Sequence, residues 1–286
     1  ANDVWFMPVA QKTGPDGCLY VLDWYDRYHC YQDANRDPAG IDRLKGRLYR
    51  IRYQDTPRVH NFDFAKQTDT ELVSELGNPN IYVRETVQRL LAERVLSEQL
   101  SEAAQQKLIE LVSSNTSPPD ARRHALWTLI SGRGITPQLW SAWCRHDDPV
   151  VQAFAIRAAG NFATLQRDAT LSQTWQTAFR QELPSLVALP LAPTAQVNLI
   201  IAARKILGRD SIDPMLQVAQ QTRLDDGLFP RILWQNLLAV MDQHPEAGND
   251  LVSNPNFIQQ PMIADLAPRL AEGLISGHPL DGNLAL

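Results

Sequence analysis

Two acidic residues near the N-terminus have the chemistry of a calcium site. Asp23 and Asp26 bracket Trp24 and Tyr25 at the end of a segment rich in strand-forming residues. Carboxylate oxygens are ligands that Ca²⁺ prefers, so this pair is the candidate metal site. The structural alternative is that Asp23 accepts backbone hydrogen bonds in the turn and that Asp26 is solvated.

Arginines form a second group of candidate residues, on the predicted inner helices of the C-terminal part. The candidate partner-binding residues are Arg84, Arg122, Arg123 and Arg157. Stacked helices could align such arginines as a basic stripe facing an acidic protein partner. The alternative is that they pair with acidic neighbours such as Glu85, Glu93 or Asp120 and hold adjacent repeats in register.

The other reactive residue types lack the spacing of a catalytic or metal site. None of the three cysteines lies in a CxxC or CxxCH motif, so the chain encodes neither a zinc cluster nor c-type haem attachment. His29 and His60 have no second ligand at metal spacing, and Cys144 is expected to be a partly buried structural thiol. Neither a nucleophile elbow nor an HExxH motif is present. The sequence therefore predicts no catalytic residue.

The composition predicts a folded chain and argues against a general nucleic-acid-binding protein. With 44% hydrophobic residues among 286, the chain can bury a substantial core. A net charge of -5 opposes a general nucleic-acid binder. No segment reaches the roughly 18 apolar residues that a membrane helix needs. The chain lacks an initiator Met and shows no leader pattern, which suggests a fragment or a processed piece.

The elements that must position these residues change character along the chain. Residues 14–17 (Gly-Pro-Asp-Gly) have turn chemistry, β-formers fill 18–25, and apolar and basic residues alternate over 46–53. These patterns predict three or four antiparallel strands within residues 1–55. One sheet of this size leaves apolar faces and open edges that need neighbours, so we expect the isolated chain to associate through residues 1–55.

Helical periodicity replaces the strand pattern from Asp69 onward, after a linker over residues 56–68. Proline-containing turns at 78–80, 117–120 and 147–149 each precede a longer inner helix. Their spacing of roughly 30 to 40 residues is typical of two-helix solenoid repeats. Residues 69–286 are therefore predicted to form a HEAT-like stack of helix pairs. The expected later helices cover 171–181, 194–207, 214–222, 230–244 and 258–275.

Several stretches in order resemble one known family. The stretches are 5–9, 14–26 and 42–51 in the predicted strands, and 71–80, 84–91 and 124–129 in the predicted helices. They look like the last blade of a glucose/sorbosone dehydrogenase-like β-propeller and the HEAT-like helices that follow it in the membrane-bound dehydrogenases of planctomycetes and verrucomicrobia.

The resemblance implies a secreted or periplasmic parent protein that oxidises a sugar or a related alcohol. Pyrroloquinoline quinone, calcium and c-type haem would belong to other parts of that parent, since this chain lacks the other blades and the CxxCH motif. The expectation is a mainly α protein, a HEAT-like α-solenoid preceded by a small antiparallel β segment resembling one blade.

In this reading the repeats form a scaffold that docks the missing upstream blades and a redox or protein partner. The chain alone is expected to be non-catalytic, to hold no cofactor and to lie in the periplasm or cell envelope. The alternative is a stand-alone HEAT-like interaction module with no enzymatic activity.

Overall fold

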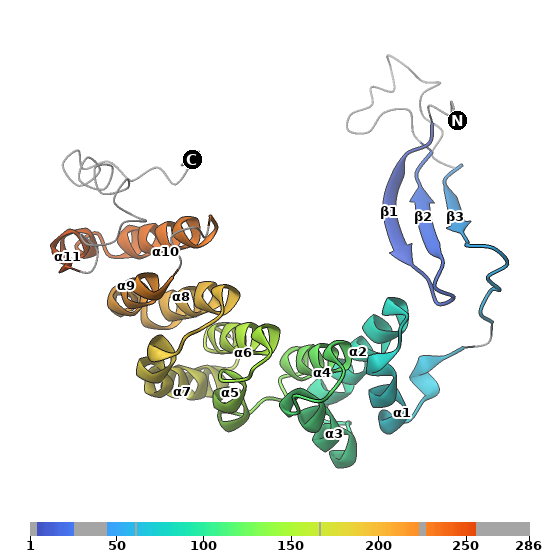
Figure 1. Cartoon of the computed structure of the whole chain (residues 1–286), viewed down its shortest axis with the longest axis horizontal. Coiled ribbons are helices and arrows are strands. Elements are labelled where there is room, and N and C mark those ends of the chain that lie inside the picture. The colour runs from blue at the N-terminus through green and yellow to red at the C-terminus, as the bar shows by residue number, and fades with distance from the viewer. Residues whose placement is uncertain (1–4, 26–44, 61, 166, 223–226, 256–286) are drawn as a thin grey trace. The chain divides into compact units, whose positions relative to one another are not determined.

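The structure, a computed structural model, describes residues 5–25, 45–60, 62–165, 167–222 and 227–255 (Figure 1). It is mainly helical, with a small three-stranded antiparallel sheet near the N-terminus, which confirms the predicted fold class. Two compact units, Ala1–Gly134 and Ile135–Leu286, divide the chain within its helical part. The predicted boundary at 56–68 stays a prediction, and the predicted helix over 258–275 lies outside the described residues.

The sheet consists of β1 (Pro8–Thr13), β2 (Leu19–Asp23) and β3 (Arg47–Ile51), in the order β1-β2-β3 with antiparallel pairing throughout. The predicted turn joins β1 to β2, and Gly17 adopts a φ of 74° there, a conformation that glycine tolerates without steric cost. Within the described residues, the outer edges of β1 and β3 pair with no further strand.

Asp16 ties this turn to the far strand. Its carboxylate accepts hydrogen bonds from Arg50 Nε at 2.6 Å, from the Tyr20 hydroxyl at 3.1 Å and from the Cys18 backbone N–H at 3.1 Å. Burial opposes the negative charge, but the donors outweigh it and lower the pKa of Asp16. The turn is thereby fixed to both β2 and β3.

Large apolar side chains are exposed on both faces of the sheet. The register places Leu19 opposite Ile51 and Leu22 opposite Leu48. Cross-strand partners share a face and neighbouring pairs alternate. One face therefore carries Leu19 and Ile51, which are 39% and 55% exposed. The other carries Leu22 and Leu48, which are 41% and 66% exposed.

Four α-helices form two stacked pairs in the described part of the first unit. They are α1 (Asp69–Ser74), α2 (Ile81–Leu96), α3 (Glu102–Ser113) and α4 (Pro119–Ser131). Each helix contacts its own pair partner, and α1 also contacts α3 while α2 contacts α4. Contact between sequential helices and between alternate helices is the pattern of two-helix repeats.

The second unit continues the same pattern. Its helices are α5 (Pro137–Trp143), α6 (Pro149–Phe162), α7 (Ala169–Ala188), α8 (Pro193–Leu207), α9 (Ile212–Gln221), α10 (Phe229–Gln243) and α11 (Ala247–Ser253). The even-numbered helices α6, α8 and α10 contact one another in sequence and form one layer, while α5, α7 and α9 form the other (Figure 1). Each layer covers the apolar side of the other, where Trp140, Trp175 and Phe179 are fully buried.

Helix α7 is longer than the sequence indicated. We expected it to end near Gln181, but it continues through Pro184 to Ala188. An internal proline removes one backbone hydrogen bond and strains the preceding turn. Burial of Leu183, Leu186 and Val187 on the inner side offsets this cost.

Two arginines near the starts of even-numbered helices fasten the turns that precede them. Arg84 is the fourth residue of α2, and its Nη1 donates to the carbonyl oxygens of Asn78 at 2.6 Å and Pro79 at 3.1 Å. Arg122 is the fourth residue of α4. Its guanidinium donates to the carbonyl oxygens of Ser114, Asn115 and Ser117.

Glutamines take the same position in the next two even-numbered helices. Gln152 of α6 accepts a hydrogen bond from the backbone N–H of Ala192, the residue that caps α8. Gln196 of α8 accepts one from the hydroxyl of Thr222, directly after α9. A polar side chain at the fourth position thus binds a connecting segment in four successive helix pairs.

Replacing Arg122 should therefore destabilise the chain far more than replacing an exposed arginine. We predict that Arg122→Ala lowers the free energy of unfolding by about 1–3 kcal/mol, because three partly buried carbonyl groups lose their donor. Urea unfolding followed by circular dichroism measures this loss. The control is Arg89→Ala, which removes an exposed pair with Glu93 and should cost less than about 1 kcal/mol. Equal losses in the two variants would contradict the anchoring role.

Candidate functional site

Asp23, the first predicted calcium ligand, is the last residue of β2 and is completely buried. Its Oδ1 accepts hydrogen bonds from the backbone N–H groups of Met7 at 2.8 Å and Tyr25 at 2.9 Å. Its Oδ2 accepts from Arg47, with both Nε and Nη2 at 2.7 Å. This arrangement joins the start of the chain, the end of β2 and the start of β3.

The charge of Asp23 is already balanced within the sheet. Burial opposes the carboxylate charge, but the donors from Met7, Tyr25 and Arg47 outweigh it and lower its pKa. Calcium would have to displace Arg47 to reach Oδ2, so the geometry favours the structural alternative at this residue. Asp26 lies outside the described residues. The described part of the chain contains no cluster of three or more His, Cys, Asp or Glu side chains suited to a metal, and calcium at Asp23 and Asp26 stays a prediction.

Arg84 points into the first unit rather than toward a partner. Its side chain is 11% exposed, and its Nε donates to His124 Nε2 at 3.2 Å. Its Nη2 lies 3.8 Å from the carboxylate of Asp120. Arg84 therefore links α2 to α4, as the register-holding alternative proposes.

His124 is held as a neutral imidazole by this arrangement. An arginine can only donate, so His124 Nε2 accepts and Nδ1 carries the proton. Nδ1 then donates to Gln88 Oε1 at 2.6 Å. Burial and the charge of Arg84 both lower the pKa of His124. Its role is to join α2 and α4 without adding a second positive charge.

The other predicted arginines differ sharply in exposure. Arg122 is 7% exposed, and its guanidinium donates to the three carbonyl groups described above. Arg123 is half-buried. Arg157, on α6 in the second unit, is exposed. The basic stripe stays a prediction, and among its members Arg157 has the exposure that a partner contact requires.

A hollow of about 470 Å³ lies between the hairpin turn and α2 in the first unit. Asn80, which caps α2, holds the two sides together through its Nδ2, which donates to the carbonyl oxygens of Gly14 at 3.1 Å and Pro15 at 3.0 Å. Charged side chains of both signs line the hollow, so it has no single electrostatic preference. The lining residues are Lys12, Thr13, Gly14, Pro15, Tyr20, Tyr82, Glu85, Thr86 and Arg89.

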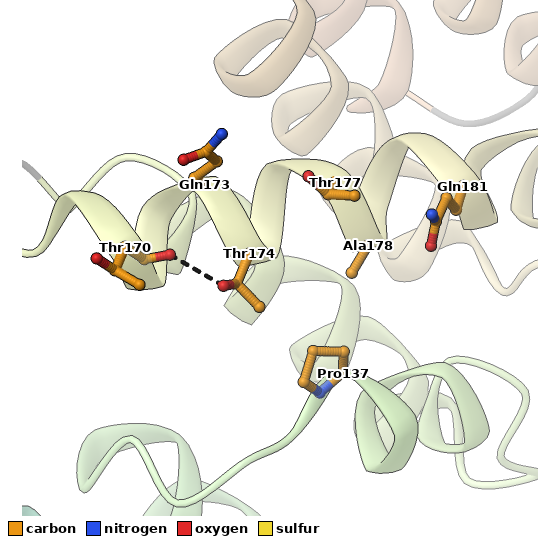
Figure 2. Close-up of a pocket in the computed structure, with 7 residues that line it drawn as sticks. All are labelled: Pro137, Thr170, Gln173, Thr174, Thr177, Ala178 and Gln181. Atoms are coloured by element: carbon orange, nitrogen blue, oxygen red, sulfur yellow. Dashed lines mark hydrogen bonds between the residues drawn. The ribbon is translucent and has the colours of Figure 1, made fainter.

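A second hollow, of about 430 Å³, lies between α7 and the start of α5 (Figure 2). Thr174, Ala178 and Gln181 of α7 point to the side on which Pro137 lies, whereas Gln173 points away from it. The Thr174 hydroxyl donates to the carbonyl oxygen of Thr170 at 2.9 Å. None of its lining residues titrates, so it offers hydrogen bonding without proton transfer. The remaining lining residue is Thr177.

Two further observations concern reactivity and membranes. Cys144 is fully buried, and burial raises the pKa of its thiol far above the ordinary value, as expected of a structural thiol. Across the described ranges, no helix combines the length and the apolar character needed to span a bilayer.

Comparison with known proteins gives one family match, which covers less than half of the chain. A model described as "Domain of unknown function (DUF7133)" matches residues 1–55, the part that contains the three strands. No curated protein matches the sequence. Among solved structures, the crystal structure of an engineered protein from a structural genomics consortium is 14% identical. The alignment covers 73% of this chain and 97% of that one with a TM-score of 0.36, which is too low to support an argument.

Protonation of His124 should weaken the first unit. Because its folded pKa is lowered from 6.5, the unfolded chain binds the proton more readily, and stability falls as the pH drops below about 6.5. We predict a smaller loss of melting temperature between about pH 7.5 and 5 in His124→Gln, measured by circular dichroism. His60→Gln, at an exposed position, is the control and should retain the full loss. An equal loss of melting temperature with falling pH in the unsubstituted chain, His124→Gln and His60→Gln would contradict a neutral, buried imidazole at His124.

Proposed function

We propose that this chain is a docking scaffold from a propeller dehydrogenase-like envelope protein, and that it has no catalytic activity alone. On this proposal the sheet is one propeller blade, and the helix pairs are HEAT-like repeats that hold the propeller and a redox or protein partner. The observation that carries the proposal is the exposure of large apolar side chains on both faces of the sheet.

Each of these exposed side chains would add to the stability of the protein if a partner covered it. Burying one leucine or isoleucine side chain stabilises a protein by about 1.5–3 kcal/mol. Leu19 and Ile51 on one face, with Leu22 and Leu48 on the other, need covering on two sides. A propeller blade packs between two neighbouring sheets, so a sheet with two apolar faces suits that position.

The helical part supports the scaffold half of the proposal. Its two layers of alternating contacts are those of a two-helix solenoid, an architecture that presents extended surfaces to partners. The second unit's hollow has no titratable lining residue, and His124 is committed to Arg84 and Gln88. A quinone, calcium ion or haem would on this proposal be held by other parts of the parent protein.

The envelope location and the dehydrogenase parentage rest on the resemblance of residues 5–9, 14–26 and 42–51 to the last blade of that family. The matched domain of unknown function covers the same region and assigns no activity. Nucleic acid is an unsuitable partner for a chain with a net charge of -5.

One contact favours the alternative of a stand-alone HEAT-like interaction module. Asn80 at the start of α2 donates to the turn carbonyls of Gly14 and Pro15. Such a contact would let the strands cap the helical stack without any blade partner. The two functions differ in one measurable respect: a cap needs only its contact to α2, whereas a blade needs both apolar faces covered.

The full chain should associate through its sheet when no partner is present. We predict oligomers at micromolar concentration in size-exclusion chromatography with light scattering, and their loss in the Leu48→Ser/Ile51→Ser variant, because apolar area leaves the contact. Leu96→Ser, at a leucine 56% exposed on α2, is the matched control and should still associate. A monodisperse monomer for the unsubstituted chain would favour the capping alternative.

A further inference from the structure

Two adjacent helices of the second unit carry positive charge and no negative charge. The only charged residue in α6 is Arg157, and those in α8 are Arg204 and Lys205. The three residues are called the basic cluster here. The chain as a whole has more acidic than basic residues, 32 against 27. The absence of Asp and Glu from both helices therefore runs against the overall composition.

Close packing of α6 on α8 brings these charges together. A Cβ atom at Gly160 would lie 3.0 Å from the Cα of Ala202, so glycine permits the approach of the two helices. The same Cβ would lie 3.7 Å from Cδ of Lys205, which places that side chain across α6 at Gly160. Lys205 Nζ donates to Asn161 Oδ1 at 2.9 Å. Arg157 lies one turn before Asn161 on the same helix face.

The basic cluster lacks a compensating carboxylate among the described residues. Arg204 Nε donates to the neutral amide of Asn236 on α10 at 2.8 Å, and Arg157 lies 5.9 Å from the ring of Phe154. Among the described residues, neither these arginines nor Lys205 forms an ion pair. Elsewhere the pattern is different, since Arg94 pairs with Asp69 and Arg145 pairs with Glu182.

The surroundings of Lys205 disfavour its positive charge when no partner is bound. Burial of its stem and the charges of Arg204 and Arg157 lower the pKa of Lys205. Arg204 and Lys205 lie in the last turn of α8, where the helix dipole partly compensates their positive charge. Arg157, in the middle of α6, receives no such compensation.

We infer that the basic cluster, together with Asn161, binds a short acidic segment of a protein partner, one with at least two carboxylate side chains. Arg157 and Lys205 are both exposed and can be reached from solvent. A guanidinium can donate two parallel hydrogen bonds to one carboxylate, and the Asn161 amide can donate to a second carboxylate oxygen. A long polyanion is disfavoured by the negative charge of the rest of the chain. The inference deepens the proposed docking function, on which it rests, by naming the chemistry of the partner.

Fluorescence anisotropy of a labelled peptide with alternating Glu and Ser, titrated with the full chain at low salt, tests this inference. Arg157→Gln and Lys205→Gln should each weaken binding about fivefold to tenfold. Arg157→Lys should retain part of the affinity because the charge stays. The matched control is Arg231→Gln, at an exposed arginine of α10, which should bind as the unsubstituted chain does.

Two results would overturn the inference. One is equal peptide affinity in Arg157→Gln, Lys205→Gln and the control. The other is tighter binding, through the same residues, of an oligonucleotide of matched charge, which would assign the cluster to nucleic acid. The Leu48→Ser/Ile51→Ser variant should bind the peptide normally, so failure of the sheet association and failure of this site are separate results.

Discussion

Helix pairs can stack only if the backbone groups of the turns between them find hydrogen-bond partners. In this chain the partner comes from the fourth residue of each even-numbered helix from α2 to α8. Arg84 and Arg122 donate to carbonyl groups of the preceding turns, and Gln152 and Gln196 accept from groups at the next connection. The layers of both units depend on this position, because it fixes where each helix begins relative to its neighbour.

The same position decides which charges remain available to a partner. Arg84 and Arg122 are used inside the first unit, and the neutral state of His124 follows from the donor that Arg84 presents to it. In α6 and α8 the fourth residue is glutamine rather than arginine. The positive charges of these helices come later in the sequence, and they include the exposed residues Arg157 and Lys205. A change of residue at the anchoring position thus accompanies a change from internal to exposed cations.

Local patterns in the sequence were sufficient to locate most helices and strands. They were not sufficient to predict which distant residues contact one another. The proline-containing turn at 78–80 correctly located the start of a longer helix, α2, which runs from Ile81 to Leu96. Pro184 misled the prediction of α7, since tertiary burial outweighed its local preference. The Arg47 partner of Asp23 follows from the register of β2 and β3, which pairs residues far apart in the chain. Lys205 and Asn161 meet only because α6 packs on α8, and no local pattern encodes that contact.

The central claim is that the chain docks partners and performs no redox chemistry alone. Calorimetric titration of the purified chain with Ca²⁺ and pyrroloquinoline quinone, paired with a dye-coupled assay on a panel of sugars, tests it most directly. The account predicts no dye reduction, whether or not Ca²⁺ binds at Asp23 and Asp26, because a quinone and a haem would be held by other parts of the parent protein. Stoichiometric binding accompanied by dye reduction would contradict it and would establish a working redox site within the chain.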